Sequence, residues 1–144
     1  EAVMKVNYEH NKFIEKELKK TLKNLKGKKI GFLGATHKPF TSNTRGSLIT
    51  PLLTKLSKAG AMPILYDPQI TPNAYTVGNL KEIFSGADAV VIAVGKKEFK
   101  SARYAALIAS MKKRNIIDAA NMFKKETIQI LKLNYYSSIG RGKF

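Results

Sequence analysis

Hydrophobic residues recur along this chain with two different spacings, and these spacings predict its secondary structure. Over residues 1–25, apolar side chains lie three or four positions apart among charged ones, which is typical of a helix with one apolar stripe. The apolar positions are Val3, Val6, Phe13, Ile14, Leu18, Leu22 and Leu25. Gly27 follows and predicts the end of the helix. A long helix is therefore expected at the start of the chain.

After Gly27, short apolar runs alternate with helical patterns. Strands are predicted at residues 29–33, 62–66, 87–94, 115–118 and 134–139, and helices at 47–59, 79–84, 102–111 and 124–131. Pro51 requires the first of these helices to begin late or to kink. Pro63 restricts the second strand to a place where its nitrogen donates no ladder bond. The alternation predicts an α/β fold with a doubly wound, Rossmann-like parallel sheet preceded by the long helix.

Composition excludes several kinds of chemistry. The 144 residues include no cysteine, which excludes disulfides, thiolate metal sites and cysteine nucleophiles, and a reducing cytoplasm fits this usage. His10 and His37 are the only histidines, so no metal site is expected. No apolar run approaches the roughly 18 residues that a membrane span needs, and no membrane partner is expected.

The formal net charge of +16 indicates an anionic partner of some kind. Lysines occur in every segment, and no basic run alternates with aromatic residues as it does in many RNA-binding domains. A diffuse, solvated lysine surface explains this pattern better than a nucleic-acid-binding stripe does. Charge alone leaves nucleic acid, an anionic membrane surface and a small anionic ligand open.

Residues 27–45 form the stretch with the clearest candidate chemistry. A strand at 29–33 runs into a turn with Gly34, and His37, Lys38 and Arg45 follow. In open α/β sheets, ligands bind at the carboxyl ends of the strands, where such loops emerge. Fixed positive charges on a glycine-containing loop suit a phosphate-bearing ligand. The glycine spacing is not GxGxxG, so no dinucleotide fingerprint is present. A second basic loop, with Lys96, Lys97 and Lys100, is expected after the strand at 87–94.

A series of short motifs resembles one known family. The motifs are Gly27-Lys28-Lys29-Ile30-Gly31, Lys38-Pro39, Arg45 with Ser47, Gly60, Tyr66-Asp67-Pro68, Gly86-Ala87-Asp88-Ala89, Glu98-Phe99, Asp118 with Asn121, and the final Tyr136-x-x-Ile-Gly-Arg-Gly. Together they resemble the C-terminal, UDP-binding domain of the UDP-glucose/GDP-mannose dehydrogenase family. The resemblance covers residues 27–144 as a nucleotide-sugar-binding domain. Residues 1–26 resemble the end of the central helix that links it to a dimerisation domain.

The resemblance implies a function for a longer parent protein. Complete members of the family use NAD to oxidise the C6 alcohol of a nucleotide sugar to a carboxylate, for polysaccharide precursor synthesis in the cytoplasm. NAD and the catalytic cysteine belong to N-terminal and central domains that are missing from this chain, and the parent is expected to be a homo-oligomer. The present chain alone should not be catalytic. The alternative is a non-catalytic basic α/β module that binds nucleic acid or another polyanion.

The resemblance also assigns roles to particular residues. It implies that His37 and Lys38 contact the substrate and that Arg45 faces the cleft shared with the cofactor. Asp118 and Asn121 are further candidates for a ligand contact.

Several positions depart from the family pattern, among them Gly46-Ser47-Leu48, which replaces Glu-Ser-Pro. Ser42 and Asn43 replace an acidic pair, and Ala120 stands where a substrate-binding arginine is expected. Losing a bidentate contact of that kind costs about 1.5–3 kcal/mol of binding.

Overall fold

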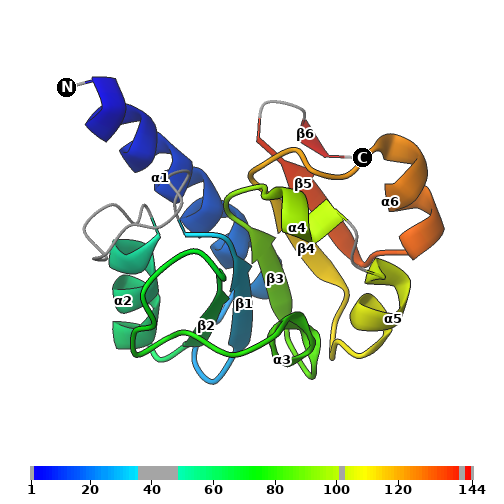
Figure 1. The fold of residues 1–144 in the computed structure, drawn as a ribbon, viewed down its shortest axis with the longest axis horizontal. Coiled ribbons are helices and arrows are strands. Elements are labelled where there is room, and N and C mark those ends of the chain that lie inside the picture. The colour runs from blue at the N-terminus through cyan, green and yellow to red at the C-terminus, as the bar shows by residue number, and fades with distance from the viewer. Residues whose placement is uncertain (1, 36–48, 101–102, 140–141, 144) are drawn as a thin grey trace.

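Six strands form a single sheet in the order β2-β1-β3-β4-β5-β6 (Figure 1). The computed structural model of the chain describes residues 2–35, 49–100, 103–139 and 142–143. The strands are β1 (Lys29–Leu33), β2 (Met62–Tyr66), β3 (Ala89–Ile92), β4 (Asn115–Asp118), β5 (Tyr135–Ser138) and β6 (Gly142–Lys143). Strands β1 to β5 pair in parallel, and β6 pairs antiparallel with β5. The parallel sheet and its five strands confirm the predicted fold class.

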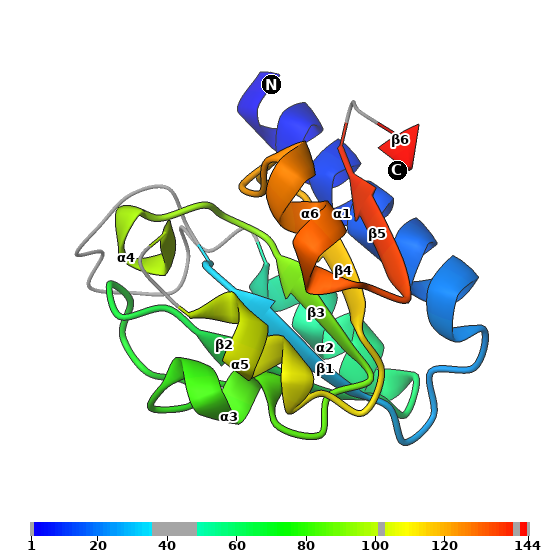
Figure 2. The same ribbon diagram turned by 90° about the vertical axis from the view of Figure 1, so that its right-hand side faces the viewer.

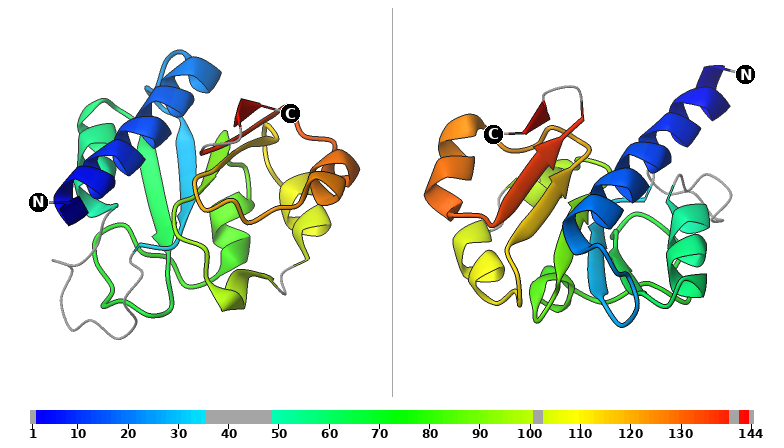
Figure 3. Two further views of the ribbon diagram at one scale, coloured as in Figure 1. Left: turned by 90° about the horizontal axis from the view of Figure 1, so that it is seen from above. Right: turned by 180° about the vertical axis from the view of Figure 1, so that it is seen from behind.

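Helices cover both faces of the sheet (Figure 2). The helices are α1 (Ala2–Leu22), α2 (Thr50–Lys58), α3 (Leu80–Phe84), α4 (Lys97–Lys100), α5 (Tyr104–Ala109) and α6 (Lys125–Leu131). Helices α1 and α2 lie on one face, and α3, α5 and α6 lie on the other. Seen from behind in Figure 3, α1 crosses the sheet over β3 and β4. The sheet is therefore doubly wound.

The core is divided by the sheet into two clusters. On β1, Ile30 and Phe32 pack with α1 and α2, whereas Leu33 packs on the face of α3 and α5. Side chains along β3 alternate in the same way, and all four are fully buried. A strand covered on both faces needs apolar residues at every position, which is why this segment reads as a continuous apolar run.

The part of α1 from His10 onward is packed against this domain's own sheet. Ile14 and Leu18 are completely buried in the core cluster that includes α2. Near the carboxyl end of β3, the His10 Nε2 atom lies 2.9 Å from the carbonyl oxygen of Ala93. The assignment of residues 1–26 to a linker or dimerisation helix stays a prediction.

A polar contact joins α1 to strand β5. The Tyr135 hydroxyl on β5 donates a hydrogen bond to the carboxylate of Glu17, which is itself buried. Burial raises the pKa of Tyr135, and the bond to Glu17 raises it further because an ionised phenol could not donate. This contact and the apolar stripe hold α1 to the domain.

Three local features differ from, or refine, the sequence-based expectation. Helix α2 begins late, at Thr50, with Pro51 in its first turn, where a missing N–H costs nothing. The segment expected as a basic loop contains the single turn α4, and Phe99 anchors it in the core with no exposed surface. Strand β6 was not expected, because two residues are too few to show an alternating pattern.

Strand β2 is an edge strand, as Pro63 predicts. A loop covers part of its free edge: the Leu65 N–H donates to the Tyr75 carbonyl at 2.9 Å, and the Val77 N–H donates to the Leu65 carbonyl at 2.9 Å. This cover protects the edge from pairing with another chain. None of the helices in the described part of the chain is long and apolar enough to cross a membrane.

Candidate functional site

The carboxyl ends of β1, β3 and β4 meet where the strand order changes direction, between β1 and β3. Gly34 follows β1 with φ +85°, and a Cβ atom there would lie 2.3 Å from the Val94 carbonyl oxygen. A Cβ on Gly95, after β3, would lie 3.3 Å from the Cβ of Ala120, after β4. Small residues thus let three strand ends approach one another. In open α/β sheets, ligands bind at the carboxyl ends of the strands where the strand order changes direction.

A buried carboxylate connects the end of β1 to the end of its other neighbour, β2. Asp67 follows β2, and its Oδ2 accepts a hydrogen bond from the Ala35 N–H at 2.8 Å. Its Oδ1 accepts from the Gln69 N–H at 2.9 Å. The Asp67 side chain has no exposed surface. It therefore fixes both the turn after β2 and the backbone position at which the chain leaves β1.

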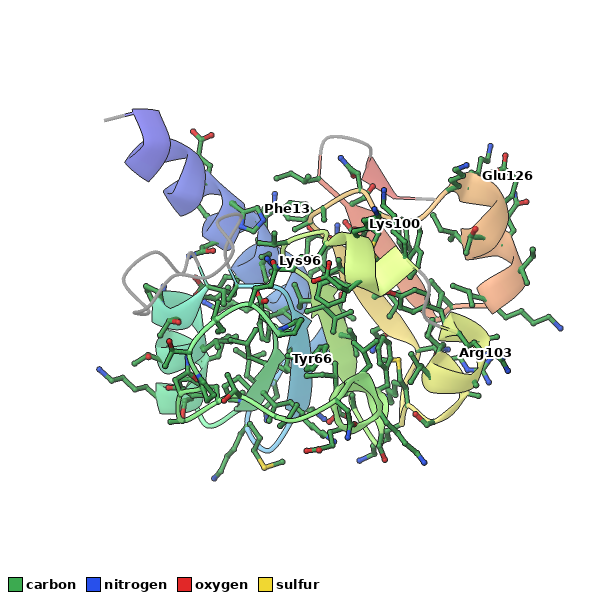
Figure 4. All side chains as sticks on the ribbon, in the orientation of Figure 1. Phe13, Tyr66, Lys96, Lys100, Arg103 and Glu126 are labelled. Atoms are coloured by element: carbon green, nitrogen blue, oxygen red, sulfur yellow. The ribbon has the colours of Figure 1, made fainter. Side chains whose placement is uncertain are left out.

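Lys96, which follows β3, completes this group. Its Nζ lies 3.5 Å from Asp67 Oδ2 and donates to Gln69 Oε1 at 2.8 Å, and its side chain is only 6% exposed. The neighbouring Lys97 and Lys100 are exposed. Figure 4 shows Lys96 beside the ends of the central strands and Lys100 on α4. The expected basic cluster is therefore divided into one buried, paired lysine and two solvated ones.

Asp118 organises the loop after β4. Its Oδ1 accepts from the backbone N–H groups of Ala120 at 3.2 Å and Met122 at 3.0 Å. Its Oδ2 accepts from the Phe123 N–H at 3.0 Å and the Tyr136 hydroxyl at 2.6 Å. The residue is completely buried. These contacts shape the loop, and a direct ligand contact by Asp118 stays a prediction.

The same loop presents Asn121 to solvent. Asn121 has φ +52°, in the left-handed region that asparagine tolerates better than most residues, and it is exposed. A ligand contact by Asn121 stays a prediction.

Burial raises the pKa of Tyr104, and the negative charge of Asp118 raises it further. Tyr104 donates from its hydroxyl to the Phe99 carbonyl at 2.5 Å, so it is held as a neutral donor.

The other sequence-predicted residues lie outside the described residues. These are His37, Lys38 and Arg45, together with Ser42 and Asn43. The described chain stops before them at Ala35 and resumes at Ile49. Ala35 and Ile49 are both completely buried in the same core cluster. Both ends of the segment that carries the predicted substrate residues are therefore anchored in the domain.

Gly31 does not serve as a glycine of the dinucleotide fingerprint. In the Rossmann fingerprint, glycines allow the backbone to approach a pyrophosphate. Gly31 instead makes room for α3, since a Cβ there would lie 2.5 Å from the Ile83 Cγ2. The part of the chain that the structure describes also holds no group of three His, Cys, Asp or Glu side chains that could bind a metal.

The pairing of Asp67 with Lys96 was missed by sequence reasoning. In the sequence, Asp67 stands before Pro68 in a pattern typical of a turn, and Lys96 belongs to a basic loop with Lys97 and Lys100. The two residues follow β2 and β3, the two neighbours of β1, and so meet over its end. The strand order would have revealed the pair, but the local sequence pattern around each residue does not predict that order.

Comparison with known proteins identifies the family. The profile of the UDP-glucose/GDP-mannose dehydrogenase family, UDP binding domain, matches residues 31–125. The chain belongs to this family. The match runs from the middle of β1 to the first residue of α6, so it contains the whole candidate site of this UDP binding domain.

Relatives of the domain are nucleotide-sugar dehydrogenases. UDP-glucose 6-dehydrogenase of Rhizobium meliloti (strain 1021) is 32% identical over 126 residues, which cover 82% of this chain and 28% of the relative. The solved UDP-D-ManNAc dehydrogenase from Pyrococcus horikoshii has a TM-score of 0.74 at 27% identity, covering 96% of this chain and 31% of that one.

A further solved structure shares the fold. The NDP-N-acetyl-D-galactosaminuronic acid dehydrogenase from Methanosarcina mazei Go1 has a TM-score of 0.76 at 24% identity, covering 94% of this chain and 29% of that one. The UDP binding domain described here thus spans about a third or less of the length of the relatives that it matches.

Proposed function

We propose that this chain binds the nucleoside diphosphate part of a UDP-sugar at the carboxyl ends of β1, β3 and β4. The observation that carries the proposal is the match of residues 31–125 to the UDP binding domain of the family. The converging strand ends, closed by Gly34, Gly95 and Ala120, offer a place where a ligand can approach backbone.

Charge supports the same assignment. A nucleoside diphosphate is an anion, and the net charge of +16 raises its local concentration near the protein. In the proposal, His37 and Lys38 contact the substrate, with Lys38 near the diphosphate, and Arg45 faces the cofactor cleft. A lysine supplies a point charge with three donors to phosphate oxygens. Asp118 holds the loop that carries Asn121 against this site.

The domain would serve a larger enzyme, an NAD-dependent nucleotide-sugar 6-dehydrogenase of the cytoplasm. Its reaction, oxidation of the sugar C6 alcohol to a carboxylate, would supply precursors for polysaccharide synthesis. NAD accepts the hydrides in such a reaction, and it would be bound mainly by another domain. The role of the present domain is to clamp the nucleotide and to complete the cleft in a homo-oligomeric parent protein.

The experiment is calorimetric titration of the 144-residue chain with UDP, UDP-glucose, UDP-N-acetylglucosamine and GDP-mannose at two salt concentrations. Saturable binding of a UDP ligand, weakened in Lys38→Ala, is expected. Lys113→Ala is the matched control, because it removes the same charge from an exposed position just before the amino end of β4. A short DNA duplex tests the alternative polyanion module. Salt-sensitive DNA binding without nucleotide binding would contradict the proposal.

A further inference from the structure

We propose that Asp67 and Lys96 are positioning residues for the nucleotide site, acting through the exit of β1. This inference rests on the function proposed above. Neither residue is assigned a ligand contact. Their role is to fix the backbone from which the substrate-binding segment starts.

The geometry of the pair supports this role. Asp67 Oδ2 accepts from the Ala35 N–H at 2.8 Å and lies 3.5 Å from Lys96 Nζ. One oxygen atom therefore connects the end of β2 to the ends of both β1 and β3. A second bond holds β1 at the same point, since the Gly34 N–H donates to the Tyr66 carbonyl at 3.0 Å. The last two described residues after β1 are both tied to the end of β2.

Chain connectivity links this anchor to the proposed site. His37 and Lys38 follow Ala35 by two and three positions. Successive Cα atoms lie about 3.8 Å apart, so the position of Ala35 limits where the following residues can lie. A shift of the anchored backbone would displace the groups proposed to bind the diphosphate. Binding that depends on the placement of charged groups weakens when their support is removed.

Because Asp67 and Lys96 are both buried, each charge needs the other as its partner. The side chains of Asp67 and Lys96 are 0% and 6% exposed, and a buried charge without a partner is strongly unfavourable. Lys96 also donates to Gln69 Oε1 at 2.8 Å, and the Gln69 N–H donates back to Asp67 Oδ1 at 2.9 Å. The side chains of Asp67 and Lys96 thus form a closed group with the side chain and the backbone N–H of Gln69, which restricts Asp67 to the orientation that accepts from Ala35.

Asp67→Asn distinguishes a positioning role of Asp67 from a purely electrostatic effect on the ligand, because the two predict opposite changes in the affinity for UDP. The substitution removes a negative charge near an anionic ligand, so electrostatic attraction alone predicts tighter binding of UDP. Asparagine keeps only one acceptor oxygen, whereas Asp67 uses both oxygens for backbone donors. Positioning therefore predicts weaker binding, with a dissociation constant that rises about tenfold.

The chain offers a matched control at the other end of the same strand. Asp88 is also buried, and its Oδ2 accepts from the Lys29 N–H at 2.9 Å, at the first residue of β1. Asp88→Asn makes the same change in charge and size. It should leave the dissociation constant for UDP within about twofold of the parent value, because the site lies at the opposite end of β1.

The test is calorimetric titration of UDP into the parent chain, Asp67→Asn and Asp88→Asn, with thermal unfolding to confirm that each variant is folded. A double-mutant cycle adds Lys38→Ala. If Asp67 acts through the segment that holds Lys38, its substitution has little further effect once Lys38 is removed. Unchanged or tighter binding by folded Asp67→Asn would overturn the inference, as would full additivity with Lys38→Ala.

A neutral variant covers the case in which Asp67→Asn does not fold. Gln69→Met removes the acceptor of Lys96 without a change in net charge, and a dissociation constant raised about threefold is expected. Binding equal to the parent value by this variant would then overturn the inference. Failure of the parent chain to bind any UDP ligand would instead contradict the proposed function.

Discussion

A buried carboxylate accepts from a backbone N–H at each end of β1, but the surroundings of the two carboxylates differ. At the amino end, Asp88 accepts from the Lys29 N–H, and its own carbonyl accepts from the Asn115 side chain at 2.8 Å. At the carboxyl end, Asp67 accepts from the Ala35 N–H, but a buried lysine lies beside it. The amino end is a closed polar cap between neighbouring strands. The carboxyl end leads directly into the segment that carries the proposed substrate residues.

This difference shows how an α/β domain separates stability from function. Carboxylates cap the backbone at both edges, and each satisfies donors that would otherwise be buried without a partner. At the carboxyl edge, the caps also set the positions of two loops, since Asp67 holds the turn after β2 and Asp118 holds the loop after β4. Substitutions at the two edges should therefore affect different measurements.

The largest effect is expected for Gly34→Ala. Its Cβ would lie 2.3 Å from the Val94 carbonyl oxygen, and φ +85° is unfavourable for alanine. Overpacking and backbone strain together should lower the free energy of unfolding by about 3–4 kcal/mol. Gly86, before β3 at the amino edge, has φ +66° and no atom within 4 Å of such a Cβ. Gly86→Ala should cost only about 1 kcal/mol in urea denaturation, and equal losses would contradict the close approach of β1 and β3.

Asp118→Asn should lower the free energy of unfolding by about 3 kcal/mol. The carboxylate accepts from three backbone N–H groups and from the Tyr136 hydroxyl, and an amide cannot accept from all four. Tyr136→Phe removes one of these bonds and should cost about 1 kcal/mol in the same denaturation experiment. If both variants were as stable as the parent, the loop after β4 would not depend on this carboxylate.

Much of the fold could be predicted from the sequence because buried parallel strands leave a strong local signal. Strands β1, β2 and β4 have the predicted bounds, since each is a short apolar run next to a turn. The single turn α4 was missed, because four residues do not show a helical period and Phe99 secures it through tertiary packing.

The candidate site was less predictable than the fold. The Asp67–Lys96 pair joins residues far apart in sequence, and only the strand order brings them together. The local sequence around Asp67 is typical of a turn, and the local sequence around Lys96 is typical of a solvated loop. Neither stretch contains the other residue, so neither predicts the pair. The roles of His37, Lys38 and Arg45 rest on family resemblance and remain predictions.

Ala120→Arg should strengthen UDP binding by about 1.5 kcal/mol, because a guanidinium can contact an anion or a carbonyl with two donors. Ala120 lies in the loop after β4, beside Gly95. Ala109→Arg is the matched control, because it adds the same charge at the exposed end of α5. Equal gains for the two variants in calorimetry would indicate general attraction rather than a contact at the carboxyl edge.

The smallest effect concerns pH and the attachment of α1. The pKa of Tyr135 is raised by burial and by its bond to Glu17. The contribution of the Tyr135 hydroxyl to the free energy of unfolding is therefore fully present below its pKa in the unfolded chain, about 10. It is lost as pH rises through the higher pKa of the folded state. Tyr135→Phe should reduce the loss of thermal stability between pH 9 and pH 11, two values chosen to lie about one unit on either side of 10. An unchanged pH profile would contradict this role of Tyr135.

The central claim, that the carboxyl edge of the sheet binds the nucleotide, is tested most directly by following backbone amide resonances during titration with UDP. Nucleotide binding at this edge should give saturable shifts at Gly34, Ala35, Gly95, Lys96 and Asn121. Small shifts are expected at the amino edge, where Lys29, Gly86 and Lys113 lie. Shifts centred on the amino edge, or spread over the lysine surface and removed by salt, would contradict it.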